Sequence, residues 1–255
     1  SAQEALVQAG KLAALGELAA GVAHELNQPL SGIMGFAQEL QRIVKEKFPD
    51  ATALDFNEEI LKNATRMKKI IQQLREFTRR SVEDFQLVDI PNVITDSMKL
   101  LEQQFKSRGI KVNLNVDSDV PKIYCNPFQL EQVFINLATN ARDAIESKAC
   151  GEGEIAIHVR RKSTDPKRFL EIEFRDDGCG MSMETKNRAL EPFFTTKEVG
   201  KGTGLGLSVS YGILSKIHGS MMIESSPGKG AAFVLTLPQD YRTLNSDQTK
   251  EGNNG

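Results

Sequence analysis

The chain has 255 residues, of which 40% are hydrophobic and 26% are charged, and its formal net charge is −2 at pH 7. This length suits one large domain or two small ones, and the near balance of charge excludes an overall basic field for nucleic acid or an anionic membrane. The three cysteines are widely spaced and form neither a CxxC metal pattern nor a disulfide framework, so we expect a reducing, cytoplasmic compartment. No apolar run reaches the roughly 20 residues of a membrane-spanning helix.

Residues 1–80 carry two amphipathic stretches separated by a turn signal, Phe48-Pro49-Asp50. Apolar residues recur every three or four positions from Leu12 to Val44 and again from Leu54 to Phe77, which is the spacing of helices with a coiled-coil-like seam. The pattern predicts an antiparallel helical hairpin. One hairpin cannot bury both apolar stripes against itself, so we predict a homodimer in which two hairpins form a four-helix bundle.

His24 lies on the first predicted helix, two residues from Val22 and two from Leu26, and therefore points away from the apolar seam. An exposed imidazole, with an ordinary pKa of about 6.5, is mostly neutral at pH 7 and has a lone pair that could attack phosphorus. Glu25 could accept a proton or hold the tautomer, and Pro29 should kink the helix just after the histidine. The alternative is an ordinary surface histidine.

From about residue 85 the hydrophobic pattern changes to that of mixed helices and strands. We expect residues 81–90 to form a linker and hinge, residues 91–238 to form a second domain, and the polar residues 239–255 to be a disordered tail. The expected helices are 91–108, 127–147 and 208–217, and the expected strands are 110–116, 154–162, 169–175, 220–225 and 231–237. These elements predict an α+β two-layer sandwich with helices on one face of the sheet.

Asn136 and Asn140 are four residues apart and therefore share one face of a predicted helix. Their amide oxygens could coordinate Mg²⁺, a hard ion that prefers oxygen ligands, and Arg142 in the same stretch could reach phosphates. Two asparagines on an exposed helix face are common, so this pattern alone is weak.

Asp176 opens the segment Asp-Asp-Gly-Cys-Gly directly after a predicted strand, and its carboxylate could accept a hydrogen bond from an adenine amino group. A plain Asp-Gly turn is the alternative. A further segment, Glu191 to Lys197, contains two adjacent phenylalanines that could cover a base or anchor a mobile segment, although core packing more often explains such a pair.

The segment Gly202-Thr203-Gly204-Leu205-Gly206-Leu207 runs into a predicted helix. Backbone N–H groups and the helix dipole at such a junction both favour phosphate. The segment contains no P-loop lysine and does not fit GxGxxG. The lysines and glycines before it are typical of a flexible lid.

Residues 16–30, GELAAGVAHELNQPL, resemble the phospho-acceptor box of bacterial sensor histidine kinases. Residues 91–238 resemble the GHKL-type (Bergerat) ATP-binding domain shared by histidine kinases, gyrase, mismatch-repair ATPases and heat-shock chaperones. The resemblance implies a protein-histidine kinase that phosphorylates His24 with the help of Glu25 and passes the phosphoryl group to a response regulator in two-component signalling. It also implies the cytoplasmic part of a sensor that could be membrane-anchored.

The same resemblance implies which residues bind ATP and Mg²⁺. The implied metal ligands are Asn136 and Asn140, and Gln28 with Asn27 stands where some relatives position water for phosphatase activity. The implied ATP-binding residues are Asn136, Asn140, Arg142, Asp143, Asp176, Gly178, Gly180, Phe193, Phe194, Thr195, Thr196, Lys197, Lys201, Gly202, Thr203, Gly204, Leu205, Gly206 and Leu207.

An ATP-hydrolysing clamp or chaperone of the same superfamily is the alternative. The hydrolysing members typically carry a glutamate four residues before the metal-binding asparagine, and this chain has Asn136 there. An amide is not a useful general base at neutral pH, which favours the kinase. A non-catalytic dimerisation scaffold is the third hypothesis.

Overall fold

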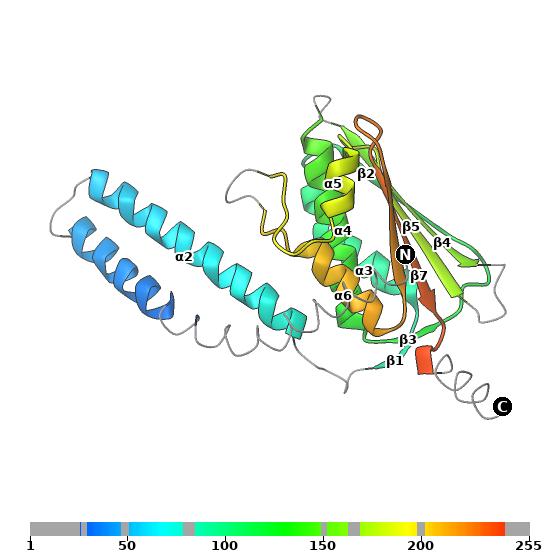
Figure 1. Ribbon diagram of the computed structural model, residues 1–255. Helices are drawn as coiled ribbons and strands as arrows, with labels where there is room; N and C mark the ends of the chain where they lie inside the picture. Colours follow the sequence, from blue (N-terminus) through cyan, green and yellow to red (C-terminus); the bar gives the residue numbers. More distant parts are fainter. Residues whose placement is uncertain are drawn as a thin grey trace. The chain divides into compact units, whose positions relative to one another are not determined.

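The computed structural model describes residue 26 and residues 30–46, 51–78, 85–148, 152–162, 169–197 and 202–242. The chain divides into two units, residues 1–80 with 197–205 and residues 81–196 with 206–255. The first contains a pair of long helices, and the second contains a sheet covered by helices (Figure 1). None of the helices described in these ranges is long and apolar enough to cross a lipid bilayer.

The first unit pairs the helix over residues 30–46 with α2 (Ala51–Thr78). The apolar side chains buried between them recur every seven residues along each helix, which keeps one seam of each helix facing its neighbour. These side chains are Leu30, Ala37, Ala64 and Ile71. The predicted helical hairpin is therefore confirmed.

A second row of large apolar side chains on the same two helices remains exposed. The exposed fractions in this row run from 42% to 68%. The row consists of Leu26, Ile33, Leu40, Phe56, Ile60 and Met67. Fully burying one such side chain contributes about 1.5–3 kcal/mol, so a contiguous exposed row of this size marks an interaction surface.

The second unit is built on a five-stranded mixed sheet with the order β2-β4-β5-β7-β6. Its strands are β2 (Ile110–Val116), β4 (Gly153–Lys162), β5 (Phe169–Asp176), β6 (Ser220–Ser225) and β7 (Ala231–Pro238). The β2–β4 pair is parallel and the other pairs are antiparallel. A separate two-stranded sheet pairs β1 (Gln86–Val88) with β3 (Ile123–Cys125).

Three helices cover one face of the five-stranded sheet (Figure 1). They are α3 (Ile90–Lys106), α4 (Pro127–Glu146) and α6 (Gly206–Lys216), and a short helix, α5 (Met183–Arg188), follows β5. The side chains of Asp89 and Asn126 cap the backbone N–H groups at the starts of α3 and α4, and a proline follows each cap, which is a strong helix-start signal.

The core lies between these helices and the inner face of the sheet. Strand residues alternate between the two faces, so every second side chain of β4 and β5 points inward and is fully buried. The inward residues are Ile155, Ile157, Val159, Leu170, Ile172 and Phe174. This two-layer arrangement confirms the predicted α+β sandwich.

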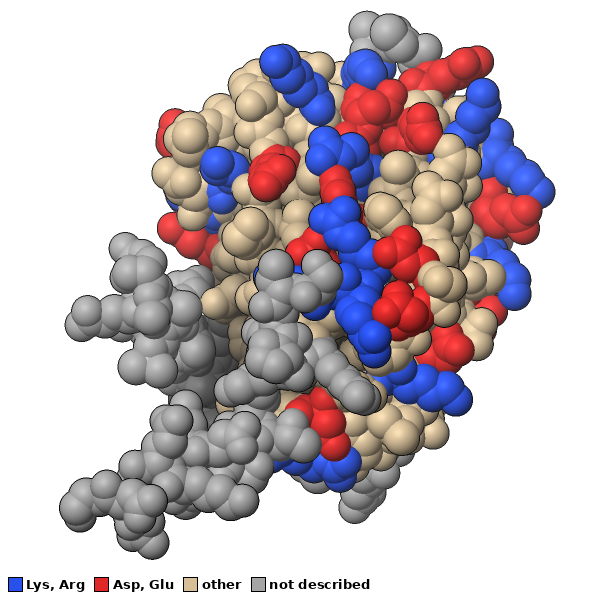
Figure 2. Space-filling model, turned by 90° about the vertical axis from the view of Figure 1, so that its right-hand side faces the viewer, with Lys and Arg blue, Asp and Glu red and all other residues tan. Residues whose placement is uncertain are grey.

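The outer face of the sheet carries paired charges across neighbouring strands. Arg160 pairs with Glu171 directly opposite it, and Arg175 pairs with Glu173 on its own strand. Figure 2 shows Lys and Arg interleaved with Asp and Glu on this side of the molecule. His158, which the sequence places opposite the isoleucines, is part of this face and lies 3.2 Å from the Asp117 carboxylate.

Three boundaries differ from those expected from sequence. Residues 86–88 form β1 and α3 begins at Ile90, so the second half of the expected 81–90 linker belongs to the sheet unit; residues 81–84 lie outside the described residues. Residues 239–242 are also part of this unit, because the Gln239 carbonyl accepts the Tyr124 N–H at 2.8 Å. Residues 197–205 group with the helical hairpin, although the expected ATP-binding domain includes them.

Candidate functional site

The centre of the site is Asp176, the last residue of the central strand β5. The Asp176 side chain is only 4% exposed, and its Oδ1 accepts the Gly178 N–H at 2.9 Å. Burial raises the pKa of this carboxyl above its ordinary value, while hydrogen bonds from the backbone of Gly178 and Ala231 oppose the shift. A buried carboxylate at a strand end is a strong acceptor for the amino group of a ligand.

Residues 177–181, here called the glycine loop, follow Asp176 and pack against the C-terminal half of α4. The Cys179 N–H donates to the Ala144 carbonyl at 3.0 Å. A Cβ at Gly178 would lie 2.7 Å from the Ala144 backbone, so only glycine fits there. Glycine is therefore required at residue 178 by the packing of the loop against α4.

Two further hydrogen bonds connect the same loop to its neighbours. The Lys148 ammonium, just beyond α4, donates to the Asp177 carbonyl at 2.7 Å, and the Asp177 Oδ1 accepts the Glu154 N–H at 2.9 Å. Sequence reasoning did not identify Lys148, because nothing in the sequence shows that α4 and β4 meet the loop.

Asn136 projects from α4 to the first turn of α6. Its Nδ2 donates to the Gly206 carbonyl at 3.1 Å and to the Ser210 Oγ at 3.2 Å. These bonds fix the orientation of the amide. The helix α6 begins at Gly206, where backbone N–H groups and the helix dipole favour anions. The structure therefore brings Asn136 into contact with Gly206, and both are candidates for the ATP site.

Asn140 lies one turn after Asn136 on α4, so the two amides are on the same helix face. Arg142 does not extend freely from that helix. Its guanidinium donates to Gln104 Oε1 on α3 at 2.5 Å and to Asp143 Oδ1 at 2.9 Å. A role for Arg142 at phosphate would require both contacts to break, and its observed role is to join α4 to α3.

The two phenylalanines are not core residues. Phe193 is 54% exposed and has a φ of +67°, which is a strained conformation for a bulky residue. The Phe194 ring is half-buried beneath the Arg188 guanidinium, 4.3 Å from the ring centroid, and Thr195 and Thr196 follow on an exposed stretch. The core-packing interpretation of this pair is therefore wrong.

The remaining candidates group with the first unit or lie outside the described residues. Lys197, Gly202, Thr203, Gly204 and Leu205 group with the first unit, where Gly204 has a φ of +68°. Lys201, the phospho-acceptor candidate His24, its neighbour Glu25, and the phosphatase candidates Asn27 and Gln28 lie outside the described residues.

The two described cysteines differ in environment. Cys125 is fully buried, and burial raises the pKa of its thiol to about 12, which makes it an inert packing residue. Cys179 lies exposed in the glycine loop. Neither environment suggests a disulfide between them.

The polar groups come from different parts of the sequence: Asp176 ends β5, and Asn136 of α4 contacts the first turn of α6. A buried carboxylate, a fixed amide on α4 and the N-terminus of α6 are suited to a ligand that has both an amino-bearing ring and phosphates. This geometry defines a nucleotide-binding protein.

Comparison with known proteins gives the family. Residues 14–82 match the His Kinase A (phospho-acceptor) domain, and residues 125–241 match the histidine kinase-, DNA gyrase B-, and HSP90-like ATPase. Sporulation kinase E of Bacillus subtilis is 37% identical over 236 residues, which cover 92% of this chain and 30% of that protein. The signal transduction histidine-protein kinase AtoS of Escherichia coli is 34% identical and is covered to 37%. The chain therefore belongs to the sensor histidine kinases, and it spans about a third of the length of these two relatives.

Solved structures share the fold. Full-length ShkA in complex with AMPPNP aligns with a TM-score of 0.67 at 22% identity, over 87% of this chain and 45% of that one. Histidine kinase ThkA in complex with the response regulator protein TrrA aligns with a TM-score of 0.61 at 26% identity, over 94% of this chain and 66% of that one.

Proposed function

We propose that this chain is the catalytic core of a sensor histidine kinase that transfers the γ-phosphoryl group of ATP to His24. The observation that carries the proposal is the combination, in one chain, of a phospho-acceptor domain with a nucleotide site in which residue 136 is a fixed amide. Such a site binds nucleotide but offers no carboxylate at residue 136 to activate water.

The described residues have separate roles in nucleotide binding. Asp176 accepts the adenine amino group, which a buried carboxylate does with high specificity because an unmatched ring would leave it unpaired. The N-terminus of α6 at Gly206 and Leu207 binds phosphate oxygens. The lid that the sequence predicts from Lys197, Lys201, Gly202 and Gly204 stays a prediction.

The amide oxygens of Asn136 and Asn140 suit Mg²⁺ only when phosphate oxygens of the nucleotide complete its coordination. Asn136 and Asn140 offer neutral amide oxygens on one helix face, and the described residues contain no group of three or more acidic, histidine or cysteine ligands. Mg²⁺ keeps several waters and binds through few protein oxygens plus phosphates, so Asn136 and Asn140 would hold it together with ATP. Bound there, the ion would neutralise charge on the phosphates.

The transfer itself needs a neutral imidazole in line with the γ-phosphorus. A ring nitrogen of His24 forms the new P–N bond, the bond between phosphorus and the bridging oxygen breaks, and the electron pair leaves with ADP. Glu25 accepts the hydrogen bond of the other ring nitrogen and holds the developing positive charge. The nucleotide-binding unit contributes positioning and electrostatic stabilisation.

The phosphoryl group would then pass to an aspartate of a response regulator. The solved complex of ThkA with TrrA supports this partner, since that kinase shares the fold over 94% of this chain. Gln28, with Asn27 beside it, could position water that hydrolyses the aspartyl phosphate of the regulator and releases inorganic phosphate.

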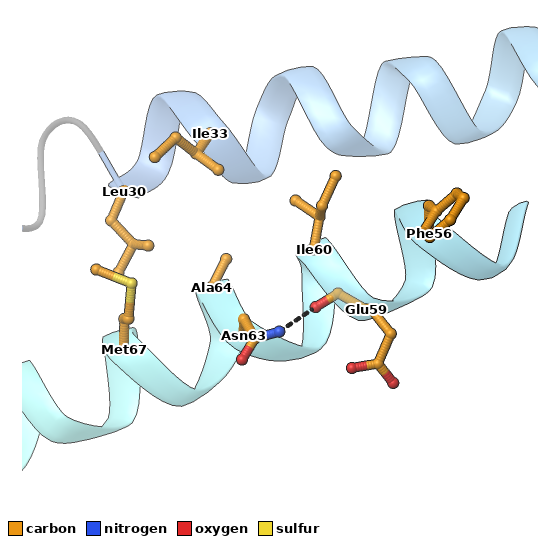
Figure 3. Close-up of a pocket in the computed structure, with 8 residues that line it drawn as sticks. All are labelled: Leu30, Ile33, Phe56, Glu59, Ile60, Asn63, Ala64 and Met67. Atoms are coloured by element: carbon orange, nitrogen blue, oxygen red, sulfur yellow. Dashed lines mark hydrogen bonds between the residues drawn. The ribbon is translucent and has the colours of Figure 1, made fainter. Parts of the chain in front are cut away.

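A second copy of the chain would cover the exposed apolar row of the hairpin. This row borders a groove of about 560 Å³, and Figure 3 shows residues of both helices around it. The groove is lined by Leu30, Ile33, Phe56, Glu59, Ile60, Asn63, Ala64 and Met67. An identical hairpin offers the same row in return, so two copies would complete a four-helix bundle.

The test is incubation of the chain with γ-radiolabelled Mg-ATP, comparing the native protein with His24→Ala. We expect the native protein to acquire an acid-labile, alkali-stable label, and the variant to acquire none. His158→Ala is the matched control and should be labelled like the native chain, because His158 lies on the outer face of the sheet. Steady phosphate release without a labelled protein would contradict the proposal and favour the ATPase.

A further inference from the structure

The turn between β6 and β7, residues 226–230, closes directly onto the glycine loop. The Gly228 N–H donates to the Cys179 carbonyl at 2.7 Å. A Cβ at Gly180, whose φ is +68°, would lie only 2.1 Å from the Ser226 carbonyl oxygen. The two backbones therefore touch with no room for a side chain, although they are about 45 residues apart in the sequence.

Ser225 is the side chain that joins the two segments. Its Oγ accepts the Met181 N–H of the glycine loop at 2.8 Å and donates to the Gly230 carbonyl of the turn at 2.7 Å. One hydroxyl thus uses a donor and an acceptor position at once, and each bond reaches a different segment.

The glycine loop and the first residue of β7, directly after the turn, supply the backbone donors to the Asp176 carboxylate. Gly178, in the glycine loop, donates at 2.9 Å, and Ala231, directly after Gly230, donates from the other side. Gly230 itself, with a φ of +71°, packs so closely that a Cβ there would lie 2.0 Å from the Asp176 carbonyl oxygen. Any shift between the turn and the loop would therefore move the donors that orient the carboxylate.

We propose that Ser225 is a positioning residue for nucleotide binding, which holds the glycine loop and the β6–β7 turn in the register that aims the Asp176 carboxylate at adenine. The inference rests on the proposed nucleotide site and adds a residue that touches no part of the ligand. It acts through the backbone donors from Gly178 and Ala231.

The experiment measures ADP and GDP binding by calorimetry for the native chain, Ser225→Ala, Ser225→Thr and Ser220→Ala. Removing the hydroxyl should raise the Kd for ADP about tenfold, as expected for a loss of about 1.4 kcal/mol, and should reduce the preference for ADP over GDP. Ser225→Thr keeps the hydroxyl and should restore ADP binding. Ser220→Ala makes the same change at the exposed opposite end of β6 and should leave binding unchanged.

The binding stoichiometry separates positioning from folding. A merely structural role would lower the fraction of protein that binds while the Kd of the remainder stays native. Native Kd values and native selectivity in Ser225→Ala would overturn the proposal. Asp176→Asn completes the design. If the native chain binds no ADP, the proposed function fails. If Asp176→Asn weakens ADP binding and Ser225→Ala does not, only the role of Ser225 fails.

Discussion

Asp176 is a buried carboxyl group, and burial favours the neutral form of its side chain over the charged form. Its side chain is 4% exposed, and burial is the largest cause of its raised pKa. The folded state therefore binds a proton at this carboxyl more readily than the unfolded chain, in which an aspartate has a pKa of about 3.9. A buried titratable group with a shifted pKa is common at functional sites, in agreement with the proposed role of Asp176 in nucleotide binding.

We predict that Asp176→Asn raises the free energy of unfolding by roughly 1 kcal/mol at pH 7, because the variant buries no charge. The native chain gains stability as pH falls through the raised folded pKa toward the unfolded pKa, since the folded state binds more protons in that window. The advantage of the variant should therefore shrink as pH falls and vanish below about pH 4. Urea unfolding at several pH values measures this difference.

Asp96→Asn is the matched control for this prediction. Asp96 is exposed on α3 beside Lys99, so the same substitution there should change stability little at any pH. A native Asp176 chain that is more stable than the variant at pH 7 would show that the backbone hydrogen bonds outweigh the cost of burial.

The backbone conformation and the exposure of Phe193 could not be predicted from the sequence. The motif marks it as a candidate, but no local pattern indicates that a phenylalanine adopts a φ of +67° with its ring half in solvent. Neighbouring residues determine that conformation, and bulky residues avoid it on their own.

Asn57 is the polar exception in the seam of the hairpin. It precedes Ala64 and Ile71 at the same seven-residue spacing and is 1% exposed. Its Nδ2 donates to the Ala37 carbonyl at 2.7 Å, whereas within the described part of the chain its Oδ1 has no hydrogen-bond partner. A single buried asparagine in a heptad seam specifies alignment at a cost in stability.

We predict that Asn57→Leu raises the free energy of unfolding of the helices by about 1–2 kcal/mol, since it removes an unsatisfied buried oxygen. The same change should loosen the alignment, so that dimers coexist with higher oligomers. Circular dichroism during heating and analytical sedimentation measure the two effects. Glu58→Leu, at the next and exposed position, should change neither the stability nor the oligomeric state. A destabilised Asn57→Leu protein would show that the hydrogen bond to the Ala37 carbonyl outweighs the cost of the unpaired oxygen.

Elements with strong local patterns were predicted from the sequence. The β4–β5 and β6–β7 hairpins match the expected ranges within a residue or two, because alternating apolar residues and a Pro-Gly turn are local signals. The six-residue helix α5 was not predicted, since it buries no side chain and has no apolar period. The partner of β1 was also beyond prediction, because β3 is short and 35 residues away.

At the scale of the whole molecule, the site could be predicted by residue type but not by contact. The asparagines, Asp176 and the glycines were identified from motifs, whereas Ser225, Gly230 and Lys148 were not. Their roles depend on two segments far apart in the chain meeting at one end of the sheet. Such pairings are set by tertiary packing, which no local pattern contains.

The exposed row of the hairpin makes a prediction about assembly. Ile60→Lys places a charge in the apolar groove, where a second hairpin could bury it only at a large desolvation cost. We expect the native chain to sediment with twice the mass of one chain. The dissociation constant of the dimer should be at least tenfold higher for the variant.

Leu100→Lys is the control for the dimer. Leu100 is 63% exposed on α3, in the other unit, so the same type of change there should leave the mass unchanged. A native chain that sediments as a monomer, or an Ile60→Lys variant that remains fully dimeric, would contradict the predicted bundle.

The central position of β5 in the sheet affects how readily the segment that carries Asp176 opens locally. β5 is bonded along its length by β4 on one side and β7 on the other, whereas β2 and β6 are edges. Amide protons of a doubly paired strand exchange with solvent only through large-scale opening, while edges and isolated helices open locally. The Asp176 carboxylate lies at the end of this doubly paired strand, so we expect the sheet edges to open while Asp176 keeps its place.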